Sequence, residues 1–191
     1  MSRPALLSSL LLAVCVPFSG LAQIPQSARS TPDKQILLTR AQQGDVSAMM
    51  WLGAGYEQGW FGTVDYQEAL KWTRRAAKRG DPDAQNDLGQ MYENGEGVPQ
   101  NYAQAAKWYR KAAEHVPDLG GAGQGRNNLG MLYLSGQGVP KNLVLAYMWF
   151  RLARTEPNLA QAKAQMTAAQ IGEAERMAAD WINSHPDPQS P

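Results

Sequence analysis

Residues Gly80–His115 read GDPDAQNDLGQMYENGEGVPQNYAQAAKWYRKAAEH, and this segment is one copy of an internal repeat. Its Leu-Gly pair and its tryptophan also occur 36 residues upstream and 41 residues downstream, so that the Leu-Gly pairs begin at Leu52, Leu88 and Leu129. Self-similarity at a period of this length is typical of arrays of paired helices. The sequence therefore predicts an all-α fold, an α/α superhelical solenoid of helix–turn–helix repeats.

Local signals place two short helices in each copy. Asp81 can cap the first helix with its side chain, and Pro82 is favoured in a first helical turn. Gly95 can take the left-handed conformation that ends a helix, and Asn101 can cap the next one. Helices of this length are unstable alone in water, so each repeat needs its neighbours. The second helix is expected to bury one face, made of Ala105, Trp108 and Ala112.

The repeated residues resemble the Sel-one-like (SLR) repeat family, a relative of the tetratricopeptide repeat. The shared pattern is Ala-x-x-x-Leu-Gly-x-x-Tyr, then Gly-x-Gly-Val-Pro, then Asn-Tyr-x-x-Ala-x-x-Trp-Tyr-x-x-Ala-Ala, and it extends over roughly residues 44–154. The resemblance implies an α/α superhelix with a concave groove. It also implies an adaptor or regulator that acts in protein complexes.

The first residues are predicted to be a signal peptide, at 1–22. Arg3 supplies a positive start, Leu6–Val16 is mostly apolar, and the small residues Gly20 and Ala22 flank the expected cleavage position. The predicted localisation is periplasmic or secreted, and no membrane insertion is expected after cleavage. A segment that is retained as an N-terminal anchor is the alternative.

The rest of the chain divides into a linker, the repeat array and a tail. Thr167 and Gln170 have the spacing of a capping box that starts a last helix. This helix is expected to cover the apolar segment Leu145–Ala153 with one face, made of Ile171, Ala174, Ala178, Trp181 and Ile182. The predicted bounds are 23–31 for the linker, 32–184 for the array, about 44–79, 80–115 and 121–156 for its repeats, about 167–184 for the capping helix, and 185–191 for a disordered tail.

Two segments depart from the repeat pattern. The glycines around Val116–Gly123 disfavour helix and predict a mobile connection between the second and third repeats. In the first repeat, Trp60 and Phe61 occupy the turn where the other repeats have Gly-x-Gly-Val-Pro. These aromatic side chains are expected either to pack against a neighbouring helix or to form an anchor at the rim of an interface.

Charge and cysteine content exclude several classes of protein. The chain has 18 Lys and Arg against 17 Asp and Glu, a net charge of +1, so a nucleic-acid partner is not expected. Cys15 is the single cysteine and lies in the signal peptide, which excludes disulfides and zinc–thiolate sites from the mature chain.

A row of basic residues on the second helices is interpreted as a solvated face or as a docking surface for an anionic partner: Lys71, Arg74, Arg75, Lys78, Arg79, Lys107, Arg110, Lys111, Arg151 and Arg154.

The sequence contains no recognisable catalytic constellation. His115 and His185 have no partner at the spacing of a metal site or a catalytic triad. The Ser-x-x-Lys and Lys-Thr-Gly motifs of serine β-lactamases are absent. We therefore predict a protein that is not an enzyme and needs neither cofactor nor metal. The alternative is an envelope enzyme or small-ligand binder that acts on cell-wall fragments or β-lactams through carboxylates such as Asp83 and Asp87.

The resemblance also indicates where a partner protein or peptide would bind. In tetratricopeptide-like arrays the first helix of each pair lines the inner curve, and asparagines there often hold a peptide backbone or carboxylate. Trp51 would fill a side-chain pocket of the partner or, alternatively, pack in the core against the leading helix. The oligomeric state stays open. The predicted groove residues are Met50, Trp51, Asn86, Asp87, Gln90, Asn127, Asn128 and Met131, with Trp60 and Phe61 as rim anchors.

Overall fold

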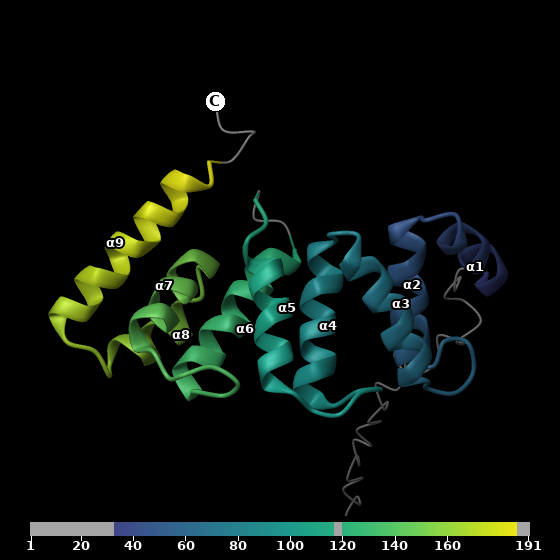
Figure 1. Ribbon diagram of the computed structural model, residues 1–191, viewed down its shortest axis with the longest axis horizontal. Coiled ribbons are helices and arrows are strands. Elements are labelled where there is room, and N and C mark those ends of the chain that lie inside the picture. Colours follow the sequence, from purple (N-terminus) through teal and green to yellow (C-terminus); the bar gives the residue numbers. More distant parts are fainter. Residues whose placement is uncertain (1–32, 117–119, 187–191) are drawn as a thin grey trace, which may run out of the picture. The chain divides into compact units, whose positions relative to one another are not determined.

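The computed structural model describes residues 33–116 and 120–186. The predicted signal peptide, the linker and the last five residues of the tail lie outside this part of the chain. Within it, every regular element is an α-helix, which confirms the all-α class (Figure 1). The helices are α1 Lys34–Gln42, α2 Val46–Glu57, α3 Tyr66–Lys78, α4 Pro82–Asn94, α5 Tyr102–Ala113, α6 Gly121–Ser135, α7 Leu143–Ala153, α8 Glu156–Lys163 and α9 Ala168–Ser184.

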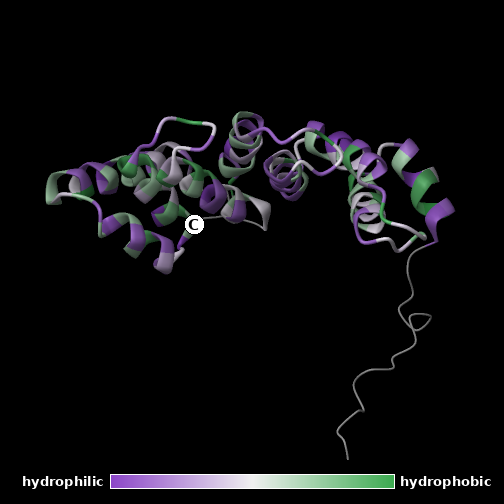
Figure 2. Cartoon of the chain, turned by 90° about the horizontal axis from the view of Figure 1, so that it is seen from below, coloured by the Kyte–Doolittle hydropathy of each residue, from purple (hydrophilic) through white to green (hydrophobic). Residues whose placement is uncertain are grey.

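Each helix packs against the next one along the chain from α1 to α8, which gives a solenoid of helix pairs (Figure 1). The first helices α4 and α6 of successive repeats also contact each other, and α9 packs against α7. Hydrophilic and hydrophobic residues alternate around the helices, as expected when each helix buries only one stripe (Figure 2). The buried residues of the described chain form two clusters, one in α1–α4 and one in α5–α9, and the partly buried Tyr92 packs against both.

Local caps begin and end the helices as the sequence predicts. The side chains of Asp81 and Asn101 accept hydrogen bonds from backbone N–H groups at 2.8 and 3.0 Å. Gly95 ends α4 in the left-handed conformation with φ 79°. Thr167 and Gln170 form the predicted capping box at the start of α9. The caps satisfy backbone groups that lack partners at helix ends.

The second helices α5 and α7 bury a tyrosine or phenylalanine more deeply than their tryptophan, whereas in α3 Trp72 itself is buried. Trp108 packs against the core as predicted, but it is only half-buried, and the Lys111 ammonium lies 4.5 Å from its ring centroid. Tyr109 is the residue with 0% exposure at this position of α5, and Phe150 has 0% exposure at the equivalent position of α7. Both rings fill space over a glycine of the preceding helix.

The glycine of the second and third Leu-Gly pairs permits this packing, whereas Gly53 of the first pair lies beside Thr73. A Cβ atom on Gly89 would lie 2.5 Å from the Tyr109 ring, and one on Gly130 would lie 2.6 Å from the Phe150 ring. Both distances are shorter than any normal carbon–carbon contact, so only glycine lets the two helices of a repeat approach this closely. The repeat pattern thus encodes a specific contact between a glycine and an aromatic ring.

Helix α6 begins inside the glycine-rich segment Val116–Gly123. The prediction that these glycines disfavour helix is wrong for residues 121–123, which belong to α6, while residues 117–119 lie outside the described part of the chain. Gly121 lies so close to α4 that an added Cβ atom would be 2.3 Å from the carbonyl oxygen of Pro82. The gain from close helix packing outweighs the low helix propensity of glycine here.

The C-terminal end differs from the prediction in two ways. Helix α8 was not predicted, although Pro157 in its first turn matches Pro82 in α4. On α9, Ala174 and Ala178 are buried as expected, but Ile182 is 56% exposed and does not belong to the covering face. Ile171 and Trp181 are partly buried against the same core, and the Trp181 ring centroid lies 6.3 Å from that of Trp149 on α7, so the covering face combines small and large side chains.

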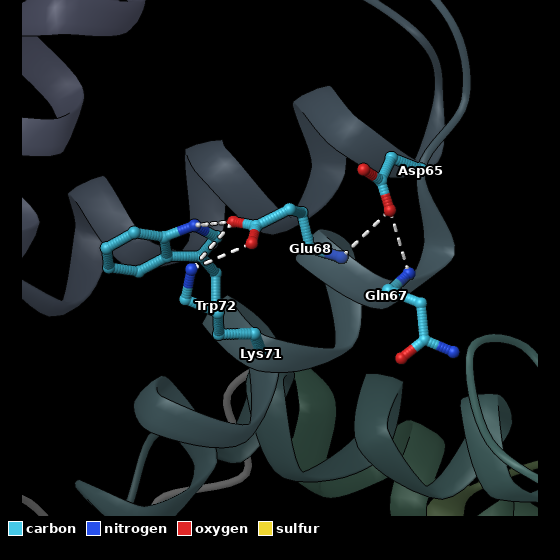
Figure 3. A network of polar contacts seen from close by, with 5 residues as sticks. All are labelled: Asp65, Gln67, Glu68, Lys71 and Trp72. Carbon is cyan, nitrogen blue, oxygen red and sulfur yellow. Dashed lines mark hydrogen bonds and ion pairs between the residues drawn. The ribbon is translucent and has the colours of Figure 1, made fainter.

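Much of the basic row stabilises the array itself. Arg74 and Arg110, at equivalent positions, donate hydrogen bonds to the tyrosine hydroxyls of the following repeat, at 3.2 and 2.6 Å. Lys71 forms an ion pair with Glu68 at 2.8 Å, and the same carboxylate accepts a hydrogen bond from the Trp72 indole (Figure 3). Part of the basic row therefore has a structural role within the array, and this role requires no anionic partner.

Candidate functional site

The face formed by the first helices begins with an aromatic pair. Trp51 on α2 is 49% exposed, and its ring centroid lies 5.8 Å from that of Trp60 in the following turn. The interpretation of Trp51 as a core residue is therefore wrong. Phe61 instead packs edge-on against Tyr56, at 5.3 Å between centroids, and fills the space beside Gly55. Packing explains Phe61, whereas Trp51 and Trp60 present an aromatic surface.

A chain of side-chain amides links α4, α6 and α8. Asn86 donates to Gln124 Oε1 at 3.1 Å and accepts from Asn128 Nδ2 at 3.0 Å. Asn127 bridges from Asn128, at 3.5 Å, to Asn158 Nδ2, at 2.6 Å. Asn86 is 0% exposed, so its amide serves the contact between α4 and α6 and does not face solvent. The sequence did not indicate Gln124, because its equivalents Asp83 and Ser47 are different residue types, or Asn158, because it lies beyond the predicted repeats.

The exposed members of the predicted set lie beside this chain. Gln90 on α4 is exposed, Met131 on α6 is 39% exposed, and Met50 on α2 is half-buried. An open depression of ≈ 580 Å³ lies next to Gln90 and to the half-buried Asn127 and Asn128. Its remaining lining is Gly120, Gly123, Gln124, Ala153 and Thr155. This depression offers amide donors and acceptors that suit a polypeptide backbone.

We expect Asn86→Ala to destabilise the fold by about 1–3 kcal/mol, because it removes a fully buried amide and the two hydrogen bonds that it makes with Gln124 and Asn128. Gln90→Ala, an exposed position on the same helix, should change the free energy of unfolding by less than about 0.5 kcal/mol. Urea unfolding of both variants is the measurement. Equal stability of the two variants would contradict a structural role for Asn86.

Carboxylates give the same face an acidic character. Burial raises the pKa of Asp87 to about 6, the hydrogen bond from Asn86 opposes this, and the Glu57, Asp83 and Asp81 carboxylates raise it further. Burial and the Glu96 carboxylate also raise the pKa of Glu57. Carboxylates that perturb each other lie close together, so this region favours a ligand with positive charge.

The raised pKa of Asp87 predicts a pH-dependent stability. Its pKa in the unfolded chain is near the model-compound value of 3.8, so between about pH 4 and pH 6 the folded state binds more protons. Its contribution to stability is therefore greatest at low pH and is lost as the pH rises through about 6. Asp87→Asn should be more stable than wild type at pH 7.5 by about 1–2 kcal/mol, and equally stable near pH 4. Urea unfolding at both pH values, with the exposed Asp180→Asn as control, tests this; a constant difference would contradict it.

The described residues offer no metal or membrane chemistry. Residues 33–116 and 120–186 contain no group of three or more His, Cys, Asp or Glu side chains arranged to hold a metal ion. None of the helices in this part of the chain has both the length and the apolar character needed to cross a bilayer. The site is therefore built from aromatic, amide and carboxylate side chains.

Comparisons with known proteins define the class to which this fold belongs. The profile of the Sel1 repeat family matches residues 46–81, 82–115 and 124–156, which together make up more than half of the chain. The chain therefore belongs to the Sel1 repeat family. Proteins of this family generally mediate protein–protein interactions, and the matches include no catalytic family. No curated protein matches the chain.

Two solved structures are similar to this chain. One is c5321, a protective antigen of uropathogenic Escherichia coli with an SLR fold, with 32% identity over 80% of this chain and a TM-score of 0.71. This chain spans only 33% of the length of c5321. The other is a Sel1 repeat protein from Oxalobacter formigenes, with 32% identity and a TM-score of 0.59; the match covers 68% of this chain and 95% of that one.

Proposed function

We propose that this protein is an exported adaptor that binds an extended segment of a partner protein along its first helices α2, α4 and α6. The observation that carries the proposal is the exposed Trp51 ring, which lies 5.8 Å from the half-buried Trp60 ring. Trp51, Asp87 and Asn128 occupy equivalent positions of the three repeats, so they lie on the same face of the array.

Each part of this face would make a different contact. The Trp51–Trp60 pair offers apolar area to a large side chain, in the manner of interface anchors. Gln90, Asn127 and Asn128 would form hydrogen bonds with the backbone, and the carboxylates around Asp87 would attract a basic residue. The expected partner segment is therefore extended, carries one bulky apolar side chain and is positively charged.

Partner capture from envelope extract tests the proposal. Trp51→Ala should reduce recovery of the partner at least tenfold, because interface tryptophans are often binding hot spots. Tyr66→Ala removes another exposed aromatic side chain, on α3 and away from this face, and should leave recovery unchanged. Full recovery by a Trp51→Ala/Gln90→Ala/Met131→Ala variant would contradict the assignment of the face.

The proposal that the protein is exported rests on the predicted signal peptide at residues 1–22. Its test is mass spectrometry of the protein from cell fractions, which should find a mature chain that begins at Gln23 in the periplasm or the medium. A chain that retains residues 1–22 in the membrane fraction would indicate an anchor instead.

One observation favours the alternative, an enzyme or small-ligand binder that acts on cell-wall fragments or β-lactams. A carboxyl group with a pKa of about 6, as for Asp87, suits general acid–base catalysis. Turnover of wall fragments or of a chromogenic β-lactam that Asp87→Asn abolishes would establish this alternative. Absence of turnover with intact partner capture would support the adaptor.

A further inference from the structure

We propose that a cavity between α7 and α9 binds an apolar carboxylate, either the C-terminal residue of another polypeptide or a free apolar acid. The cavity has a volume of ≈ 350 Å³, within the range of small-ligand pockets. It shares no lining residue with the predicted groove on the first helices. The inference therefore goes beyond the proposed adaptor face.

The walls of the cavity are mostly apolar. Leu152 and Ala178 form buried wall on α7 and α9, and the half-buried Trp181 adds an aromatic surface. Ile182 also lines the cavity and is 56% exposed. An apolar ligand group that covers the Ile182 side chain would be stabilised by about 25 cal/mol for each Å² of apolar surface removed from water.

Three arginines and one glutamate supply the charge of the cavity. Glu175 is already engaged, because it accepts from the Tyr147 hydroxyl at 2.7 Å and lies 3.4 Å from Arg151. Arg126 is held in place by the carbonyl oxygens of Ala113 and His115, at 3.0 and 2.8 Å. Among the described residues of the lining, arginines outnumber carboxylates, which favours an anion.

Arg154 is the residue whose placement points most clearly to a ligand. It ends α7 with φ 56°, and no other non-glycine residue of the described chain has a positive φ. Its equivalents in the other repeats, Ala77 and Ala113, are buried helical residues. Its guanidinium makes no hydrogen bond or ion pair to any described residue, although it lies at the cavity. Glycine would adopt this left-handed backbone conformation without strain. An arginine at this position therefore costs the fold some stability.

A guanidinium at the end of an apolar cavity defines the class of ligand. Arginine binds a carboxylate with two parallel hydrogen bonds, which a neutral amide cannot reproduce. The apolar walls would hold the side chain of a terminal residue or the body of a free acid. Capture of a terminal carboxylate is a known mode of peptide recognition.

Calorimetric titration of the full mature chain tests the proposal with matched probes. The probes are an acetylated hexapeptide that ends in a free Phe carboxylate, the same peptide with a C-terminal amide, and 3-phenylpropionate. We expect saturable binding of the free-acid peptide or of 3-phenylpropionate, and whichever binds identifies the source of the carboxylate. The amidated peptide should bind at least tenfold more weakly than its free acid.

Variants distinguish the cavity from other sites and from loss of folding. Arg154→Gly should weaken binding at least tenfold without lowering the melting temperature, because the left-handed position suits glycine. Arg176→Ala removes an exposed arginine of α9 outside the cavity and should bind like wild type, as should Trp51→Ala. Absence of saturable binding by both carboxylates, equal binding of acid and amide, or unchanged binding by Arg154→Gly would overturn the proposal.

Discussion

Removal of residues 166–191, which deletes α9, is expected to abolish cooperative folding of the C-terminal repeat and to cause aggregation. Helix α9 packs against α7, whose Met148, Trp149 and Leu152 are 5–7% exposed in the intact chain. Each large side chain that loses its cover costs roughly 1.5–3 kcal/mol. Three such losses are comparable to the whole stability of a typical domain, about 5–15 kcal/mol.

Point variants test whether the contact between α9 and α7, and not merely the presence of α9, stabilises the array. Ala174→Glu places a charge at a position of α9 with 0% exposure, and we expect a loss of about 3–5 kcal/mol, as for an unpaired buried charge. Ala169→Glu introduces the same charge at an exposed position in the first turn of α9, where the helix dipole favours it. Thermal unfolding followed by circular dichroism measures both. A truncated chain with an unchanged melting temperature would show that α9 does not close the array.

Phe150→Ala should destabilise the protein by about 3–5 kcal/mol, because the ring is 0% exposed and its loss leaves a cavity between α6 and α7. The effect should be coupled to Gly130, since a Cβ atom there would lie 2.6 Å from the Phe150 ring. In the wild-type background Gly130→Ala is therefore expected to cost about 1–3 kcal/mol through overpacking.

A double-mutant cycle makes this prediction sharper. Once Phe150 is replaced by alanine, the clash disappears and Gly130→Ala should stabilise α6 by about 0.5–1 kcal/mol through helix propensity. Gly172→Ala on α9, where the nearest atom lies 3.8 Å from the added Cβ, should give this gain in the wild-type background. Urea unfolding of the four cycle members measures the coupling, and additive effects would contradict the contact.

The adaptor face and the α7–α9 cavity draw on different residues, so their tests are independent. Trp51 and Gln90 belong to the first-helix face, whereas Arg154 and Trp181 belong to the cavity. One partner that presents an internal basic segment and a free C-terminus could occupy both. Loss of capture by Trp51→Ala and by Arg154→Gly would indicate such a partner.

Part of the candidate site was predictable from the sequence. The repeat register places Trp51, Asp87 and Asn128 at equivalent positions, and periodicity assigns such positions to one face. Periodicity did not show that Asn86 is fully buried, because its partners Gln124 and Asn128 lie on another helix. The exposure of Trp51 likewise depends on how Trp60 packs in the next turn.

Caps and turns followed from local sequence because their hydrogen bonds join residues within a few positions of each other. Asp81, Gly95, Asn101 and the Thr167–Gln170 pair act where the sequence predicted. Long-range packing decided the rest. The Tyr109 ring takes the buried position instead of Trp108 because it fits over Gly89, and Gly121 is tolerated in α6 because α4 approaches it closely. Such contacts join residues of different helices, so only the folded array determines which side chain fits between them.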